Sequence, residues 1–288
     1  MAMNDAAGIA PLSLARCSIN TATLGHNLPI EQIIELVARA GFGAIAPWRR
    51  DLEGRDAAAI GRRIREAGLG VSGYCRSTYF PADAAEQFRA NVADNRRALD
   101  EAAALGAPCF VLVVGSLPEG GRDLASARAQ VAEGIALLLD HARASGVALA
   151  LEPLHPMYAG DRSCVTSLAE ALALCEALDP ERRGGINAVL DIYHLWWDWR
   201  LADDIQRAGH AGRIGAFHVC DWLVPTTDLL LDRGMMGDGV IDIRGIRAQV
   251  EQAGYRGFVE TEIFSRYWWG RPAAEVLETC AQRLVERC

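Results

Sequence analysis

The feature that most constrains the fold is a regular alternation of short apolar runs with amphipathic segments along the whole chain. Glycine closes several of the amphipathic segments just before the next apolar run, at Gly41, Gly68, Gly106, Gly146 and Gly254. Glycine in this place is a common C-cap of a helix, and such marks at intervals of ~30–40 residues are typical of repeated strand–helix units. The pattern therefore predicts an α/β protein built from consecutive βα units.

Eight apolar runs have the length and composition of β-strands. They cover residues 14–19, 44–47, 71–74, 109–114, 148–152, 188–191, 214–219 and 258–263. Eight strands that alternate with helices over 288 residues predict a (β/α)8 TIM barrel. A doubly wound open sheet is the main alternative, but it usually carries a glycine-rich ligand turn that we do not find. Because no Pro- or Ser-rich linker divides the chain, we expect one domain over residues 1–288, with residues 1–11 as a flexible N-terminus.

The residue types that the chain lacks exclude several enzyme classes. All 29 basic residues are arginine, so Schiff-base chemistry, which needs a lysine amine, is excluded. A P-loop motif is also absent. The net charge of −8 argues against a nucleic-acid surface, and no apolar run is long enough to span a membrane. Without a secretion signal, and with eight cysteines that form no CxxC pair, the protein is expected to be cytoplasmic with reduced thiols.

Charged residues stand at the ends of four consecutive predicted strands. Glu152 ends the strand in "ALALEPLHP", and Asp191 ends the strand in "AVLDIYH". His218 lies in "IGAFHVCD", and the last strand, in "GFVETEIF", carries Glu260 and Glu262. The C-terminal ends of barrel strands meet at the face where TIM barrels carry their chemistry. We therefore expect these side chains to converge at one rim.

A divalent cation explains why carboxylates and an imidazole would share that rim. A strand-end carboxylate alone usually caps a helix or joins an ion pair, and a lone buried histidine is usually a core residue. Four such residues on successive strands favour a metal site, because crowded carboxylates without a cation raise each other's pKa. Oxygen ligands with one imidazole suit Mn²⁺ first, with Mg²⁺, Co²⁺ and Zn²⁺ as alternatives. Of the two glutamates, Glu262 lies nearer the rim, and Glu260 is expected to pair with an arginine or to support the ligands.

Aromatic residues follow the predicted strands and indicate a carbohydrate substrate. Aromatic faces pack against the apolar C–H faces of sugars and exclude water. We expect Trp48 and Trp222 to line the pocket, while Trp196, Trp197 and Trp199 could equally cover the rim or an oligomer contact. His155, three residues after Glu152, is expected either in the same pocket or as an ordinary loop residue.

The chain resembles the xylose isomerase-like TIM-barrel superfamily, in particular its sugar phosphate isomerase/epimerase members. The resemblance covers essentially the whole chain and is carried by "LALEPLHP", "AVLDIYHLWW", "GAFHVCDW", "DRGMMGDGVIDI" and "FVETEIFS". In ketose 3-epimerases, inosose dehydratases and hydroxypyruvate isomerase-like proteins, a Glu, Asp, His, Glu set binds one divalent metal. By motif position, the resemblance assigns this role to Glu152, Asp191, His218 and Glu262.

The resemblance also implies roles in catalysis and substrate binding. Glu152 and Glu262 would be the catalytic acid/base pair, which removes a proton from one face of a carbon and returns one to the other. His194 and Arg233 would bind substrate oxygens. The "GDGVID" segment resembles the family's loop after strand seven, where Gly237 and Gly239 permit tight turns.

These features predict a divalent-metal-dependent isomerase or epimerase that acts on a keto sugar, glycoside or cyclitol through a metal-stabilised enediolate. A metal-dependent lyase or dehydratase is the first alternative, and a non-catalytic sugar-binding or partner subunit is the second. Endonuclease IV is disfavoured because its three-metal cluster needs more histidine than the six present. Xylose isomerase proper is disfavoured because its lysines have no counterpart. The expected partner is a small-molecule carbohydrate, and a homo-oligomer (dimer or tetramer) stays open.

Overall fold

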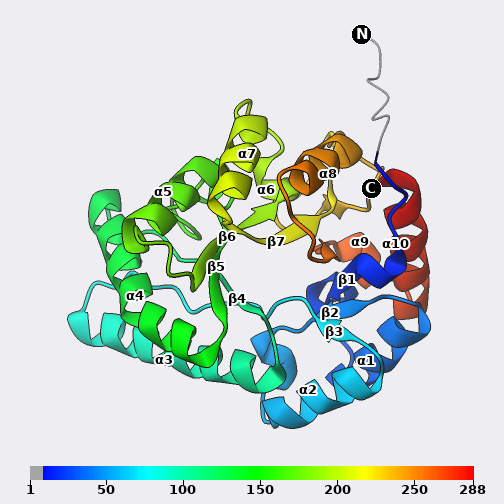
Figure 1. The fold of residues 1–288 in the computed structure, drawn as a ribbon, viewed down its shortest axis with the longest axis horizontal. Coiled ribbons are helices and arrows are strands. Elements are labelled where there is room, and N and C mark those ends of the chain that lie inside the picture. The colour runs from blue at the N-terminus through cyan, green and yellow to red at the C-terminus, as the bar shows by residue number, and fades with distance from the viewer. Residues whose placement is uncertain (1–8) are drawn as a thin grey trace.

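Eight parallel strands form one sheet at the centre of the molecule, and helices surround it on the outside (Figure 1). The computed structural model describes residues 9–288. In the order in which they lie side by side, the strands are β3 (Gly70–Val71), β2 (Ala44–Ala46), β1 (Cys17–Asn20), β10 (Val259–Thr261), β7 (Ile214–Val219), β6 (Ile186–Asp191), β5 (Ala148–Leu151) and β4 (Cys109–Leu112).

The segment that follows β3 closes the sheet into a barrel. Tyr74 forms a parallel bridge with Phe110 of β4. The Tyr74 amide donates a hydrogen bond to the Cys109 carbonyl (3.0 Å), and the Val111 amide donates one to the Tyr74 carbonyl (2.9 Å). The two ends of the sheet therefore meet, and the predicted (β/α)8 TIM barrel in a single domain is confirmed.

The helices lie between successive strands, as the amphipathic segments predict. They are α1 (Ile30–Arg39), α2 (Ala57–Glu66), α3 (Ala85–Leu105), α4 (Leu124–Ser145), α5 (Leu168–Leu178), α7 (Leu201–Ala211) and α8 (Ile243–Gln252), with α10 (Ala273–Arg287) after the last strand. The five glycines expected to end helices all have φ between +72° and +99°, a backbone region that favours glycine. Within residues 9–288, no helix combines the length and the apolar character that crossing a membrane requires.

Short elements fill the connections. The 3₁₀ turns are η1 (Leu14–Arg16), η2 (Thr21–Leu24), η3 (Arg49–Leu52) and η4 (Pro156–Tyr158); the short helices are α6 (Ile192–Leu195) and α9 (Arg266–Trp269). The first strand was expected to begin at Leu14 but begins at Cys17, because the Ser13 side chain and carbonyl cap a 3₁₀ turn before it. Residues 1–8 of the expected flexible N-terminus lie outside the described residues.

Side chains that face the barrel interior are small at the bottom and charged at the top. Along β5 the alternation that places Ala150 inside also places Glu152 inside, just beyond the strand. Val189 and Asp191 are related in the same way on β6, and both are buried. Because successive side chains of a strand point to opposite faces, the strand register alone aims these carboxylates into the barrel mouth.

A two-stranded hairpin after β7 was not expected from the sequence. It pairs β8 (Asp221–Trp222) with β9 (Arg233–Gly234), and Trp222 lies opposite Arg233. The Asp221 carboxylate accepts hydrogen bonds from the amides of Gly237 and Gly239, both at 2.9 Å. Gly237 has φ +90°, and a Cβ at Gly239 would lie 2.1 Å from the Trp222 carbonyl oxygen. The expected tight turns at these glycines are therefore present, and the hairpin holds Arg233 over the barrel.

Asp179 holds the approach to β6 through a buried ion-pair network. Its carboxylate lies 2.8 Å from Arg143 and 2.8 Å from the buried Arg213. We expect Asp179→Ala to lower the free energy of unfolding by about 3–5 kcal/mol, since it leaves the buried Arg213 guanidinium without its carboxylate partner. Asp140→Ala is the matched control: Asp140 pairs with the same Arg143, but its side chain is 90% exposed, so the expected loss is at most about 1 kcal/mol. Urea denaturation measures both, and equal losses would contradict the assignment.

Candidate metal centre

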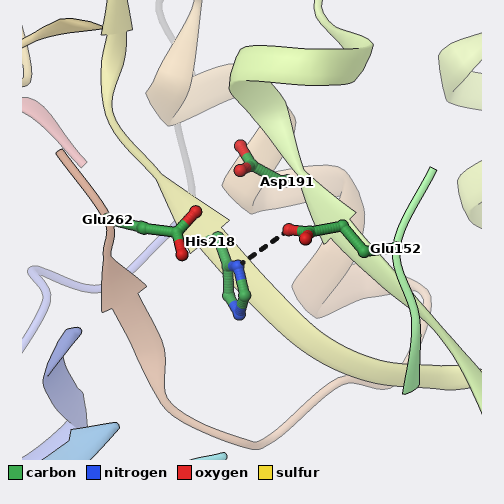
Figure 2. A group of neighbouring side chains, drawn as sticks. All are labelled: Glu152, Asp191, His218 and Glu262. Carbon is green, nitrogen blue, oxygen red and sulfur yellow. Dashed lines mark ion pairs between the residues drawn. The ribbon is translucent and has the colours of Figure 1, made fainter. Parts of the chain in front are cut away.

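The four side chains that the sequence predicts as metal ligands come together at the C-terminal mouth of the barrel. Each of them offers one ligand atom, and these atoms all lie within 4.8 Å of one another: Glu152, Asp191, His218 and Glu262. All four residues are buried, with exposed fractions of 5% or less. Figure 2 shows Glu152 and Glu262 approaching from opposite sides, with Asp191 and His218 between them.

The strands fix the directions of these side chains. On β7 the His218 Cα lies opposite Asp191 of β6 and opposite Glu260 of β10. Glu262 follows Glu260 by two residues, so it points to the same side one layer higher. Asp191 also accepts a 2.8 Å hydrogen bond from the Tyr193 amide at the start of α6, so the helix cap holds this carboxylate in place.

Unsatisfied polar atoms indicate that the cluster suits a cation. Glu152 Oε1 and both ring nitrogens of His218 are buried without a hydrogen-bond partner in the described structure. His218 Nδ1 lies 3.4 Å from Glu152 Oε1. One ion could contact both atoms at this separation. Buried polar atoms are normally satisfied, so this donor set of three carboxylates and one imidazole fits a divalent metal ion.

The electrostatics of the cluster lead to the same conclusion. Burial and the neighbouring Glu262 carboxylate raise the pKa of Asp191 to about 6, although Arg233 opposes this. Burial, followed by the Glu152 carboxylate, also raises the pKa of Glu262. For His218, burial disfavours the charged ring, but Glu260, Glu152 and Glu262 outweigh it and raise its pKa to about 10. The cluster therefore attracts positive charge, which a cation can supply in place of protons.

Arg233 closes the cluster from the β8–β9 hairpin. Its Nη1 lies 3.2 Å from Asp191 Oδ2 and 3.1 Å from Glu262 Oε2, and its side chain is only 4% exposed. The guanidinium also stacks over the ring of Tyr193, 4.4 Å from its centroid. Arg233 Nη2 lies 3.2 Å from His194 Nε2. Arg233 therefore contacts two of the carboxylates that would hold a metal, and His194 approaches one of them, with Nε2 3.7 Å from Asp191 Oδ2.

Glu260 contacts polar side chains rather than the arginine considered from the sequence. It accepts hydrogen bonds from Asn20 Nδ2 (2.8 Å) and Ser72 Oγ (2.7 Å), and its Oε1 lies 3.5 Å from His218 Nε2. Within residues 9–288 no arginine lies within 4.0 Å of its carboxylate. Glu260 thus lies beside Nε2 of His218, on the opposite side of the ring from Glu152, a place from which a carboxylate can orient a metal-binding imidazole.

Glu260→Gln should weaken metal binding while leaving the four ligands unchanged. We expect the Mn²⁺ affinity to fall about 10- to 100-fold, the usual effect of removing the partner that orients a ligating histidine. Calorimetric titration of the metal-free protein with Mn²⁺ measures this. Glu133→Gln, an exposed glutamate on α4, serves as the control and should bind like the wild type. An unchanged affinity in Glu260→Gln would show that Glu260 does not orient His218.

A cavity lies directly over the cluster, with a volume of ≈ 140 Å³. Its walls include the cluster residues Glu152 and Glu262, and also His194, Arg233 and Trp48, which the sequence predicts as substrate-binding residues. The Trp48 indole donates a 2.6 Å hydrogen bond to Asn20 Oδ1. Asn20 Nδ2 in turn lies 3.0 Å from Glu262 Oε1. Asn20 therefore links one cavity wall to a candidate metal ligand.

Two residues predicted to bind substrate, His155 and Trp222, do not line the cavity. His155 stacks on Trp222, with ring centroids 5.1 Å apart and an interplanar angle of 24°. Trp222 also packs against Tyr193 and Trp196. His155 reaches the site indirectly, because its amide donates a 3.1 Å hydrogen bond to Nδ1 of His194. Among the described residues, Trp48 is the one tryptophan that lines this cavity.

Several residues of the site were not predicted from the sequence. The cavity is also lined by Cys75, Arg76, Val111, Val113, Leu154, Tyr158, Arg162, Leu230 and Phe264. Asn20 ends β1, so the rule that points to the late strands would have found it if applied to the first one. Tyr158 and Arg162 lie in the connection between β5 and α5, where no periodicity indicates which way a side chain points.

Fold and site together define a TIM-barrel protein with a candidate metal centre at the C-terminal mouth of the barrel. The family model of the xylose isomerase-like TIM barrel matches residues 34–284. The chain belongs to this family. No curated protein matches it in a sequence search.

Solved structures share the whole fold. Protein SMc04130 from Sinorhizobium meliloti 1021 is 50% identical, with a TM-score of 0.92 over 96% of this chain and 99% of that chain. The IOLI protein, crystallised with a binding zinc atom, is 18% identical, with a TM-score of 0.80 over 94% of this chain and 97% of that chain. D-psicose 3-epimerase, crystallised in the presence of D-fructose, is 20% identical, with a TM-score of 0.76 over 93% and 96%. The last two establish a common fold.

Proposed function

We propose that this protein is a divalent-metal-dependent isomerase or epimerase that acts on a keto sugar or a related carbohydrate. The observation that carries the proposal is the placement of two carboxylates, Glu152 and Glu262, in the wall of one cavity. Both also belong to the buried four-residue cluster. The family, the zinc atom of the IOLI crystal and the epimerase activity named for a structural neighbour support the proposal.

The four cluster residues would hold the cation, for which Mn²⁺ is our first choice. When bound, a divalent cation would polarise the substrate carbonyl and favour loss of a proton from the adjacent carbon. The residues of this chain would do the rest of the chemistry. One of the two glutamates would take the proton from one face of that carbon, and the other would deliver a proton to the opposite face.

The other cavity residues would orient the substrate and exclude water. His194 is fully enclosed, and burial together with the nearby Arg233 charge holds its pKa well below the ordinary value. Because Nδ1 accepts a hydrogen bond from the His155 amide, the neutral ring carries its proton on Nε2 and would donate a hydrogen bond to a substrate hydroxyl. Trp48 and Phe264, whose ring centroids lie 5.5 Å apart, present apolar surface to the C–H face of a sugar. A dry, shaped site strengthens each electrostatic contact made inside it.

Deuterium incorporation tests the proposed reaction. The Mn²⁺-loaded protein would be incubated in deuterated water with a panel of neutral and acidic keto sugars. We expect an isomeric or epimeric product that carries deuterium at the carbon next to the carbonyl, and no product from the metal-free protein. An unsaturated product would instead identify a lyase. Tight metal binding without exchange in any sugar of the panel would favour a non-catalytic sugar-binding subunit.

A further inference from the structure

Two arginines in the cavity wall have no part in the proposed proton transfer. Arg76 follows β3, and Arg162 lies in the connection between β5 and α5. Both are half-buried and line the same cavity as Glu152 and Glu262. Partial burial of a guanidinium costs free energy when its five N–H donors find no acceptors. The contacts of both groups therefore show whether they have partners within the protein or are available to bind a ligand.

Aromatic rings hold Arg76 instead of a carboxylate. Its guanidinium carbon lies 4.9 Å from the ring centroid of Tyr79 and 6.0 Å from that of Trp48. In the part of the chain that the structure describes, no carboxylate lies within 4.0 Å of Arg76, and its guanidinium donates no hydrogen bond. Stacking on aromatic faces fixes the plane of a guanidinium and leaves its edge free to donate. Arg76 is therefore a positioned cation with free donors.

Arg162 is held in a similar way on the same wall. Its guanidinium carbon lies 5.5 Å from the ring centroid of Tyr158. The acidic contact of Arg162 is with its sequence neighbour Asp161, at 3.9 Å, and the Asp161 side chain is 70% exposed. An exposed pair of this kind holds an arginine weakly. Tyr158 and Tyr79 pack in one apolar cluster, so the two guanidinium groups stand on one side of the cavity.

The charges of the loaded site leave a surplus of positive charge. Arg76, Arg162 and Arg233 with a divalent cation carry five positive charges. The three ligating carboxylates and Glu260 carry four negative charges. Asp161 is left out of this count because its side chain is 70% exposed to water and does not line the cavity. Arg233 is occupied by Asp191 and Glu262, so the surplus falls on the wall that holds Arg76 and Arg162. One negative charge on the bound molecule would balance it.

We propose that Arg76 and Arg162 form a subsite for an oxyanion, and that the substrate is an acidic sugar that presents a carboxylate to them. This inference rests on the proposed function for the carbonyl end of the molecule. A planar guanidinium matches a carboxylate or a phosphate with two parallel hydrogen bonds. The single surplus charge favours a carboxylate over a phosphate dianion.

Binding of sugars that lack a carbonyl tests the subsite without turnover. The probes are D-glucitol, D-gluconate and D-glucitol 6-phosphate, titrated calorimetrically into the Mn²⁺-loaded protein. We expect D-gluconate to bind at least about 10-fold more tightly than D-glucitol, the usual effect of a charge-assisted hydrogen-bonding pair. Arg76→Gln should reduce this preference to about two-fold or less, because D-gluconate loses its charge-assisted hydrogen bonds and the uncharged D-glucitol has none to lose. Arg50→Gln is the matched control, because Arg50 is exposed and does not line the cavity.

The outcomes separate the subsite from the reaction. An Arg76-dependent preference for either anion supports the subsite, and the preferred anion identifies carboxylate or phosphate as its ligand. Equal binding of all three probes, or a preference that persists in both Arg76→Gln and Arg162→Gln, overturns the inference. Circular dichroism checks that each variant is folded. Arg76-dependent binding without deuterium exchange in any sugar would leave the subsite standing while the proposed reaction fails.

Discussion

Glu152→Gln should reduce the interconversion of the two sugar isomers by about 10²- to 10⁴-fold, the range usual for loss of a positioned acid or base. Glu262→Gln should have an effect of the same order. The two side chains face one another across the cluster (Figure 2), and both line the cavity. Glutamine keeps the size of the side chain and an oxygen acceptor, but it cannot take up the proton.

The two variants should differ in the isomer into which they still exchange deuterium. If each glutamate serves one face of the carbon, Glu152→Gln should still exchange deuterium into one of the two isomers, and Glu262→Gln into the other. Nuclear magnetic resonance of each purified isomer in deuterated water measures this. Glu133→Gln is the control and should match the wild type. Loss of exchange into both isomers in both variants, with the cation still bound by metal analysis, would contradict the assignment of one face of the carbon to each glutamate.

Mn²⁺ should stabilise the protein strongly. A ligand that binds only the folded state at about 1,000 times its dissociation constant adds about 4 kcal/mol to the free energy of unfolding. For a domain of this size, that is a rise in melting temperature on the order of 10 °C. The physical reason is the cluster itself, in which Glu152 Oε1 and both ring nitrogens of His218 are buried without hydrogen-bond partners. Thermal unfolding with and without Mn²⁺, after treatment with a chelator, measures the effect.

Asp191→Asn should remove most of that stabilisation while keeping the cap of α6. Asn caps a helix as well as Asp does, so the hydrogen bond from the Tyr193 amide can be kept while the ligand charge is lost. Glu133→Gln again supplies the comparison, with the full metal-dependent rise expected. A rise in Asp191→Asn equal to that of the wild type would mean that Mn²⁺ stabilises the protein from another place.

The fold and the core of the site could be predicted because both depend on short-range periodicity. The βα repeat and its terminal glycines define the barrel, and the two-residue alternation of a strand decides that Asp191 faces the mouth. The placement of Glu152, Asp191, His218 and Glu262 within 4.8 Å of one another follows from the strand ends. Their roles as ligands, and the acid/base roles of two of them, remain predictions that the variants above address.

The surroundings of the cluster could not be predicted because loops set them. Arg233 reaches Asp191 because a hairpin pairs Asp221–Trp222 with Arg233–Gly234. No local pattern in the sequence predicts that pairing. Trp222 was expected in the pocket, and His155 either there or as an ordinary loop residue; neither lines the cavity, and the two rings stack on each other. The loop and the short hairpin that carry them have no regular period from which the direction of a side chain can be predicted. For the same reason, the sequence did not predict that Arg76 and Arg162 line the cavity.

Anomalous diffraction from crystals soaked in Mn²⁺ would locate the bound cation. The proposed metal centre predicts one strong manganese peak per chain, bounded by Glu152, Asp191, His218 and Glu262 and within bonding distance of each. A strongest peak anywhere else, or a fully soaked crystal with no peak among these four side chains, would contradict it.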